Sequence, residues 1–265
     1  MGPSQSSDEY DPLLGSNDDR IFFVYKYYSM AVHYITYATH EQGTLKDLKS
    51  SGVTVLGMGK KWNGFMDKFK GVLEYLSTCK DDDIVVYLDG FDSKIIGDPE
   101  PAIEKFKSMN VPVMFSVVCC FWFKYLHYRS TGICNNITIA NSGLYIGYVK
   151  YLKPLLKDSI ESSTDDDQRA INKLCKKHNI HLDTNSEIFY NKSPACKYDN
   201  KHNAPFYSEP GKFGYKRLKR VPREYYKYFV LEIFTLISVF FAVNQKLGYT
   251  VSLFFILTYI ISKYT

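Results

Sequence analysis

The six cysteines of this chain lack the spacing of a zinc ribbon or of a disulfide scaffold. A structural zinc site usually draws paired ligands from CxxC-like motifs, and a small disulfide-rich fold needs a dense cysteine framework. Neither pattern occurs among Cys79, Cys119, Cys120, Cys134, Cys175 and Cys196. We therefore expect most of the cysteines to be core or surface thiols, and a cytosolic, reducing setting for the folded body.

The first 20 residues lack both the basic start and the apolar run of a secretory signal. They are acidic and polar, and Ser, Asp, Gly, Pro and Asn dominate their composition. Such a segment buries too little apolar surface to offset the entropy that is lost on ordering. We expect residues 1–20 to be disordered.

The net positive charge of the chain is confined to one block. Residues 216–228 contain six Lys and Arg residues against one Glu, a net charge of +5 that equals the formal charge of the whole chain. A body that is otherwise neutral does not present the basic surface that nucleic-acid binding requires, so we expect no nucleic-acid partner. A basic block beside an apolar tail is typical of a juxtamembrane segment.

The tail that follows contains two apolar segments, 229–243 and 247–261, of 15 residues each. Each is shorter than the roughly 20 residues that cross an average bilayer, although flanking tyrosines or a thin membrane would let the first one span. We predict a membrane-associated helical hairpin over residues 229–265, with a buried helical pair at the edge of the body as the alternative. The positive-inside bias then places the body on the cytosolic face, with an endomembrane as the expected location.

Apolar runs alternate with helical patterns through residues 21–215, which we interpret as one domain. The run at 84–88 is continuous and apolar, as in a central parallel strand that is covered on both faces. Further strand-like runs lie at 30–38, 53–56, 111–120 and 139–149, and helical patterns lie at 43–49, 65–76, 101–109, 150–157 and 166–177. This order predicts an α/β fold with a Rossmann-like, mainly parallel sheet that binds ligands at the carboxyl ends of its strands.

Two carboxylates three residues apart follow the run at 84–88. Asp89 and Asp92 flank Gly90 and Phe91, and the glycine permits a tight turn. At the end of a strand, both carboxylates can point at one hard cation, Mn²⁺ or Mg²⁺. The alternative is that they only cap the turn and the start of the next element.

Three adjacent acids, Asp165, Asp166 and Asp167, precede a predicted helix. The helix dipole favours anions at this end, so capping is one interpretation. Three acids exceed what a cap needs, however, and one of them is a candidate to bind an acceptor hydroxyl or to act as a general base.

Small polar residues interrupt the strand pattern at 139–149. Asn141, Ser142 and Gly143 suit a close approach of the backbone to a ligand, and a plain bulge is the alternative explanation.

The order and spacing of several motifs resemble the N-terminal glycosyltransferase domain of procollagen lysyl hydroxylases and related collagen glycosyltransferases. The pieces are LGMGKKW at 56–62, LDGFDSKIIGDPEPAIEKF at 88–106, NSGLYIGYV at 141–149, DDDQ at 165–168 and LDTNSEIFYN at 182–191. The resemblance covers about residues 30–205. It implies a GT-A type of fold and a UDP-sugar as the donor substrate.

Carried over residue by residue, the resemblance implies that Asp89 and Asp92 hold Mn²⁺. Phe91 falls at the position of an aromatic residue that stacks near the uracil, and Thr39 falls where the first strand meets the nucleotide. Lys68 matches a lysine that faces the diphosphate.

On the sugar and acceptor side, Trp122 and the acids at 165–167 match positions of the family's site. The family's third metal ligand is a histidine in a His-Gly-Asn-Gly-Pro stretch. This chain has His202 in the shorter stretch 202–205, which lacks both glycines, so an exposed loop histidine is the alternative. The glycine-rich insertion of the family is reduced to residues 63–67.

We therefore expect a metal-dependent hexosyltransferase that moves galactose or glucose from a UDP-sugar to a hydroxyl acceptor, either hydroxylysine in a protein or a glycan. One alternative is a membrane-attached scaffold or interaction protein that has the same fold without transfer activity. Another is a nucleotidyltransferase, because the same pair of acids can serve other chemistry on nucleotide diphosphates.

Overall fold

The computed structural model describes residues 30–118, 124–135, 138–192, 203–209, 226, 229–240 and 256. The first half of the body contains β1 (Val32–Tyr37), α1 (Leu45–Ser50), β2 (Thr54–Leu56), α2 (Met66–Leu76), β3 (Ile84–Leu88), β4 (Ser93–Ile95) and α3 (Glu100–Met109). The second half contains β5 (Val113–Val117), α4 (Lys124–Thr131), β6 (Ala140–Tyr148), α5 (Val149–Glu161), α6 (Asp167–Leu174), β7 (Ile180–Leu182), β8 (Phe189–Asn191) and β9 (Phe206–Ser208).

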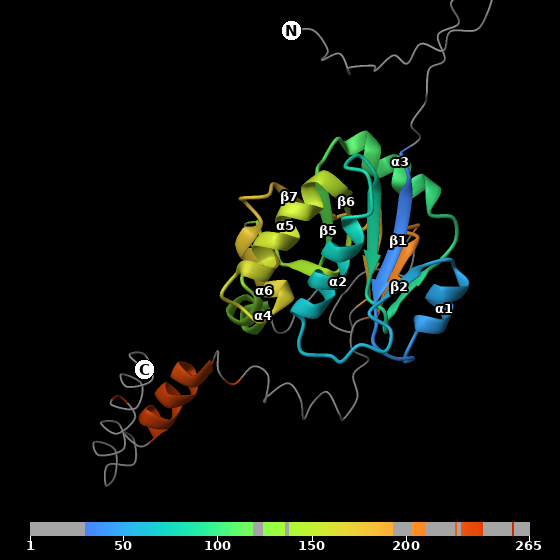
Figure 1. Cartoon of the computed structure of the whole chain (residues 1–265). Coiled ribbons are helices and arrows are strands. Elements are labelled where there is room, and N and C mark those ends of the chain that lie inside the picture. The colour runs from blue at the N-terminus through green and yellow to red at the C-terminus, as the bar shows by residue number, and fades with distance from the viewer. Residues whose placement is uncertain are drawn as a thin grey trace, which may run out of the picture. The chain divides into compact units, whose positions relative to one another are not determined.

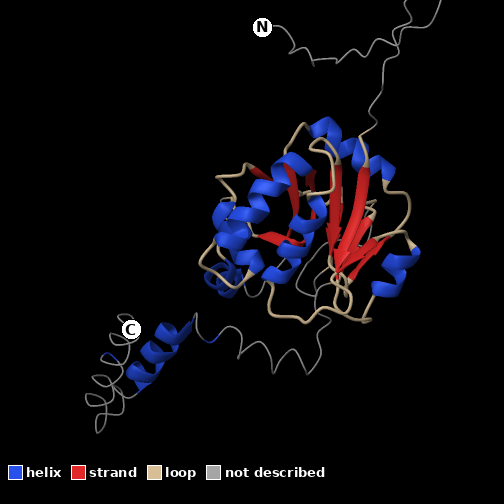
Figure 2. Ribbon diagram, in the orientation of Figure 1, coloured by secondary structure: helices blue, strands red, loops and turns tan. Residues whose placement is uncertain are grey.

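A six-stranded sheet in the order β2-β1-β3-β6-β5-β7 forms the centre of the body (Figures 1 and 2). β1 pairs in parallel with β2 and β3, and β5 pairs in parallel with β7. β6 runs antiparallel between β3 and β5. The prediction of a Rossmann-like α/β fold with a mainly parallel sheet is confirmed. The reversal of β6 was not predicted, because a hydrophobic run does not encode the direction of its strand partners.

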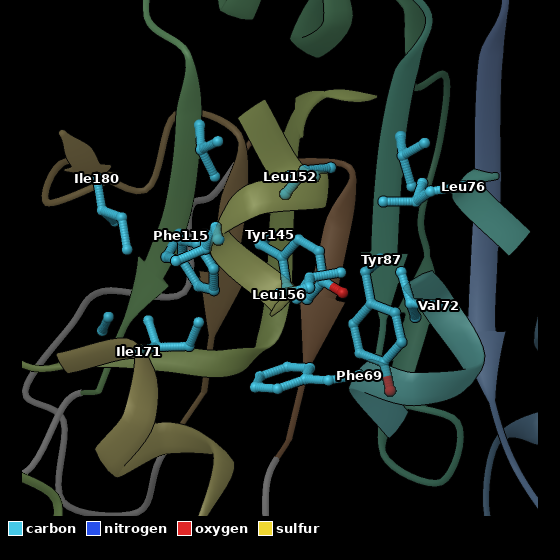
Figure 3. Packing of buried hydrophobic residues seen from close by; sticks show 14 of the residues in the cluster. Phe69, Val72, Leu76, Tyr87, Phe115, Tyr145, Leu152, Leu156, Ile171 and Ile180 are labelled. Carbon is cyan, nitrogen blue, oxygen red and sulfur yellow. The ribbon is translucent and has the colours of Figure 1, made fainter. Parts of the chain in front are cut away.

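The main core lies between this sheet and the helices α2, α5 and α6 (Figure 3). Phe69, Val72 and Leu76 lie at helical spacing along α2 and are buried against the sheet. On the sheet, Tyr145 lies between two aromatic neighbours, with its ring centroid 4.8 Å from that of Tyr87 and 4.9 Å from that of Phe115. This stack of three rings crosses β3, β6 and β5, and it supports the end of the sheet where the polar residues gather.

A second sheet of three short strands has the order β4-β9-β8, and a ring of β9 contacts a ring of β1. The ring of Phe206 lies 6.1 Å from that of Tyr34 and 5.8 Å from that of Phe189. The sequence did not predict these strands, because three residues are too few to show a period of two.

Cys134 and Cys175 form a disulfide bond, with their Cα atoms 5.2 Å apart and a sequence separation of 41. These two cysteines are exceptions to the expectation that most cysteines are thiols. Spacing along the chain does not reveal which cysteines meet, because the fold brings the segment before β6 against the end of α6. The bond fixes the end of α6 that is opposite to its acidic start.

Residues 229–240 are helical and cover part of the predicted hairpin. Within the part of the chain that the structure describes, no helix has the length and apolar character needed to cross a membrane. The rest of the two apolar segments and almost all of the basic block 216–228 lie outside the described residues, so the hairpin stays a prediction.

Asn172 provides a test of how α6 is attached to the sheet. Its buried side chain accepts a hydrogen bond from the backbone N–H of Ala140 at 2.9 Å, and it donates to the carbonyl of the same residue at 3.3 Å. We predict that Asn172→Ala lowers the free energy of unfolding by about 1–3 kcal/mol, because a buried N–H loses its acceptor. Denaturant unfolding measures this change. The exposed Asn185→Ala is the matched control, expected to stay within about 0.5 kcal/mol of the wild type. Equal effects of the two substitutions would contradict this attachment.

Candidate functional site

The reversed strand β6 brings Asp89 and the 141–143 segment together. Asp89 follows directly after β3, and its backbone N–H donates to the carbonyl of Gly143 at 2.8 Å. Because β6 is antiparallel to β3, the beginning of β6 lies at the carboxyl end of β3. Two segments that lie far apart in sequence thus border one site.

The backbone at 141–143 is both bulged and closely packed. Between Phe115 and Ser116 the pairing of β5 with β6 shifts register, so the bulge interpretation is correct for this segment. A Cβ atom on Gly143 would lie 3.2 Å from Oδ1 of Asn141 and 3.4 Å from Cβ of Asp89. Glycine therefore lets β6 pass close beside the Asp89 side chain.

Gly90 has a similar role in the turn that follows. A Cβ atom at this position would lie 3.0 Å from Oγ1 of Thr36 and 3.1 Å from Cβ of Ala38. The turn between Asp89 and Asp92 thus passes over the end of β1, where a larger residue would force the strand away.

Lys68 connects the acids that the sequence analysis had treated separately. It lies in the first turns of α2, its side chain is buried, and its ammonium forms an ion pair with the carboxylate of Asp167. The same ammonium lies 3.8 Å from Oδ2 of Asp89. Burial opposes the charge of Lys68, but Asp167 and Asp89 outweigh it and raise the pKa of Lys68 above its ordinary value. The lysine therefore remains charged between two carboxylates.

The three acids at the start of α6 have three different environments. Asp166 caps the helix, since its Oδ1 accepts a hydrogen bond from the backbone N–H of Arg169 at 2.8 Å, and burial raises the pKa of its carboxyl. Asp167 is buried and accepts a hydrogen bond from Ser142 at 2.7 Å. Asp165 is exposed. Capping is thus the observed role of Asp166, whereas Asp167 faces Lys68 and β6.

Asp92 lies directly before β4, and its side chain is partly buried. Its Oδ1 accepts hydrogen bonds from Ser208 at 3.1 Å and from Ser93 at 3.4 Å. Burial and the nearby charge of Asp89 raise the pKa of Asp92 to about 7. The two carboxylates therefore influence each other electrostatically, and whether they share one cation stays a prediction.

Thr39 and Phe91, the two residues expected on the nucleotide side, meet through His40. The hydroxyl of Thr39 and Nδ1 of His40 are hydrogen-bonded at 3.0 Å, and the His40 ring lies 5.1 Å from that of Phe91. The sequence analysis did not select His40. Its position directly after Thr39 was the available signal, but only the fold shows that its ring lies against Phe91.

Trp122 and His202 lie outside the described residues. The described neighbours of His202 show how the chain enters β9: the carbonyl of Pro205 accepts a hydrogen bond from Ile96, just beyond β4. The other end of β9 lies beside Asp92, where the backbone N–H of Glu209 donates to the Asp92 carbonyl at 2.9 Å. Ser208 is therefore the described residue around β9 whose side chain contacts Asp92. The role of His202 as a metal ligand stays a prediction.

The described residues offer an incomplete set of ligands for a metal ion. In the ranges given above, no group of three or more His, Cys, Asp and Glu side chains is arranged to hold one. Asp89 and Asp92 supply carboxylate oxygens, which suit Mn²⁺ or Mg²⁺. These two residues fit such an ion, with further ligands to come from substrate phosphates or water, as is usual for Mg²⁺ sites.

The Lys68–Asp167 pair generates a test of the electrostatics of the site. We predict that Lys68→Met lowers the free energy of unfolding by about 3–5 kcal/mol, because Asp167 is left buried without its partner. Adding Asp167→Asn should recover a large part of that loss. Denaturant unfolding of the single and double variants measures the coupling between the two residues. Lys70→Met, at an exposed position of the same helix, is the control. A double variant as unstable as the sum of its singles would contradict the pair.

Comparison with known proteins links this chain to one family. A family model described as the PLOD GT domain, where GT denotes glycosyltransferase, matches residues 16–203. Procollagen-lysine,2-oxoglutarate 5-dioxygenase 2 of Homo sapiens is 29% identical over 155 residues, which cover 52% of this chain and 21% of that protein. The multifunctional procollagen lysine hydroxylase and glycosyltransferase LH3 of Homo sapiens is 26% identical over 184 residues, which cover 61% of this chain and 25% of that protein.

An uncharacterised protein of Acanthamoeba polyphaga mimivirus is 26% identical over 146 residues, which cover 51% of this chain and 32% of that protein. The chain thus spans between a fifth and a third of the length of these three relatives. The family model, by contrast, matches well over half of the chain and includes every element from β1 to β8. The chain belongs to the PLOD GT domain family.

Proposed function

We propose that this chain is a GT-A type hexosyltransferase that moves galactose or glucose from a UDP-sugar to a hydroxyl acceptor. The observation that carries the proposal is the convergence of Asp89, Lys68 and Asp167 at the carboxyl end of β3. Family membership supports glycosyl transfer as the type of reaction. The names of the relatives, which include procollagen lysine hydroxylases, support hydroxylysine as one acceptor, with a glycan as the other.

The charges at the site suit a nucleotide diphosphate leaving group. A divalent ion held by Asp89 and Asp92 would neutralise negative charge on the diphosphate as the glycosidic bond breaks. Lys68 supplies a second positive charge, 3.8 Å from Oδ2 of Asp89. Because Asp167 holds Lys68 in place, the ammonium needs little reorganisation to face the phosphates.

The remaining predicted residues divide between the two ends of the donor. Phe91 and His40 offer ring surfaces for the uracil, and the Thr39 hydroxyl lies beside them. On the other side, Asp165 is exposed and Asp166 is half-buried, so these two are the candidates to orient an acceptor hydroxyl or to take its proton. Asp167 is engaged by Lys68 and Ser142, which favours a positioning role for this carboxylate.

A non-catalytic scaffold or interaction protein is the second candidate function. It is favoured by the lack of a third ligand side chain around Asp89 and Asp92 in the described residues. The shortened stretch 63–67, which runs into the start of α2, supports it as well, because less chain is left to cover a donor. Transfer activity distinguishes the two candidates.

Substitution of Asp89 or Asp92 tests the proposed transferase activity. We predict that the wild type releases UDP from UDP-galactose or UDP-glucose in the presence of Mn²⁺. Asp89→Asn or Asp92→Asn should lower the rate of this release at least about 100-fold. That decrease corresponds to about 2.7 kcal/mol of lost charge stabilisation. Binding of UDP that depends on Mn²⁺, measured by calorimetry, should weaken in parallel. Asp82→Asn, at the opposite end of β3, is the control. A wild type that neither binds UDP nor releases it from either donor would favour the scaffold.

We further propose that the C-terminal tail associates with an endomembrane. In helix 229–240, Leu236 is 71% exposed and Phe240 is 64% exposed, which leaves an apolar surface for lipid. The charge pattern favours a cytosolic body, whereas the Cys134–Cys175 bond favours an oxidising compartment. The disulfide is the stronger of these two arguments for the side of the membrane, because reducing compartments keep most thiols reduced.

Flotation with lipid vesicles tests the tail. We predict that Leu236→Glu combined with Phe240→Glu lowers the bound fraction of the full chain at least about tenfold, because each charge is costly to bury in hydrocarbon. Ile96→Glu makes the same chemical change at an exposed site of the body and should leave binding unchanged. Equal flotation of all three proteins would contradict the role of the tail.

A further inference from the structure

Asp92 is held by a residue that lies far away in sequence. Ser208 donates its hydroxyl hydrogen bond to Oδ1 of Asp92 across a separation of 116 residues. Ser93 and Ser208 are direct partners in the antiparallel pairing of β4 with β9, so their side chains lie on the same face of the small sheet. Both serines are buried, and both hydroxyls reach the same carboxylate oxygen.

β9 is the central strand of its sheet, which fixes Ser208 from both sides. It pairs antiparallel with β4 and parallel with β8. Beside Ser208, the backbone N–H of Glu209 donates to the carbonyl of Asp92, and the N–H of Lys192 donates to the carbonyl of Ser208. The position of the Ser208 hydroxyl is therefore set by the backbone of two neighbouring strands.

We propose that Ser208 is a positioning residue that orients the Asp92 carboxylate for a divalent cation, an inference that rests on the proposed metal-dependent function. Two hydroxyl donors on Oδ1 restrict the rotation of the carboxylate. With Oδ1 engaged in this way, Oδ2 would be the oxygen that binds the cation. Hydrogen bonds of this kind to ligating carboxylates commonly determine metal affinity.

The two serines contribute unequally. The Ser208 bond, at 3.1 Å, is shorter than the Ser93 bond, at 3.4 Å, which is near the outer limit for a hydrogen bond. Ser93 is also the next residue after Asp92 and moves with it, whereas Ser208 is anchored independently in β9. Ser208 is therefore expected to fix the carboxylate more strongly than Ser93 does.

The alternative is that the bond to Asp92 only gives the buried hydroxyl of Ser208 a hydrogen-bond partner. That role predicts a change in stability without a change in metal affinity. The two roles are distinguished by titrating Mn²⁺ into the full-length chain and measuring free Mn²⁺ by electron paramagnetic resonance. Thermal unfolding of each variant in the absence of metal shows whether its fold is intact.

We expect Ser208→Ala to weaken Mn²⁺ binding about tenfold. Ser208→Thr keeps the hydroxyl and suits a strand, so it should bind within about threefold of the wild type. Ser93→Ala should weaken binding less than Ser208→Ala does. Asp92→Asn is the reference for loss of the ligand itself and should weaken binding most.

The results of this titration test the positioning role of Ser208 separately from the metal site. Unchanged binding by Ser208→Ala, together with weakened binding by Asp92→Asn, would overturn the positioning role and leave the proposed metal site intact. A threonine variant as weak as the alanine variant would also overturn it. A wild type that binds no Mn²⁺ even when UDP is added, or an Asp92→Asn variant that binds it normally, would refute the metal site and the positioning role together.

Discussion

The ion pair between Lys68 and Asp167, with Asp89 close by, is the constraint around which the site is built. A buried ammonium is stable only when opposite charges surround it, so α2 must bring Lys68 to the place where β3 ends and α6 begins. Ser142 of β6 completes the arrangement through its hydrogen bond to Asp167. Four elements from separate parts of the chain thus meet at one lysine, and displacement of any of them leaves a charge buried without its partner.

The direction of β6 gives this cluster its shape. Because β6 runs against β3, its polar first residues lie beside Asp89, while its later residues carry Tyr145 into the aromatic stack between Tyr87 and Phe115. The same strand therefore supplies one wall of the site and part of the core beneath it. Gly143 allows the close approach, since a Cβ atom there would lie only 3.2 Å from Oδ1 of Asn141 and would also contact Asp89. Packing and site geometry are linked along this strand.

The short strands and the disulfide hold the edges of the site. β9 returns from far along the chain and places Ser208 against Asp92, so the second acid of the predicted pair depends on a strand of three residues. The Cys134–Cys175 bond joins the end of α6 to the segment before β6, and Asn172 ties the same two elements by hydrogen bonds. Neither feature has a local signature. A three-residue strand shows no periodicity, and cysteine spacing does not reveal a partner.

The sequence by itself determined the α/β class, the strand that ends at Leu88, the apolar face of α2 and the acids that follow a strand or start a helix. These features are local, because each follows from periodicity or from residue type over a few positions. The tertiary structure decided that β6 is reversed, that Lys68 lies between Asp89 and Asp167, and that Asp166 caps α6 whereas Asp167 faces the site. These features depend on which distant segments meet, and the free energy of such contacts comes from burial and charge pairing that no single stretch of sequence contains.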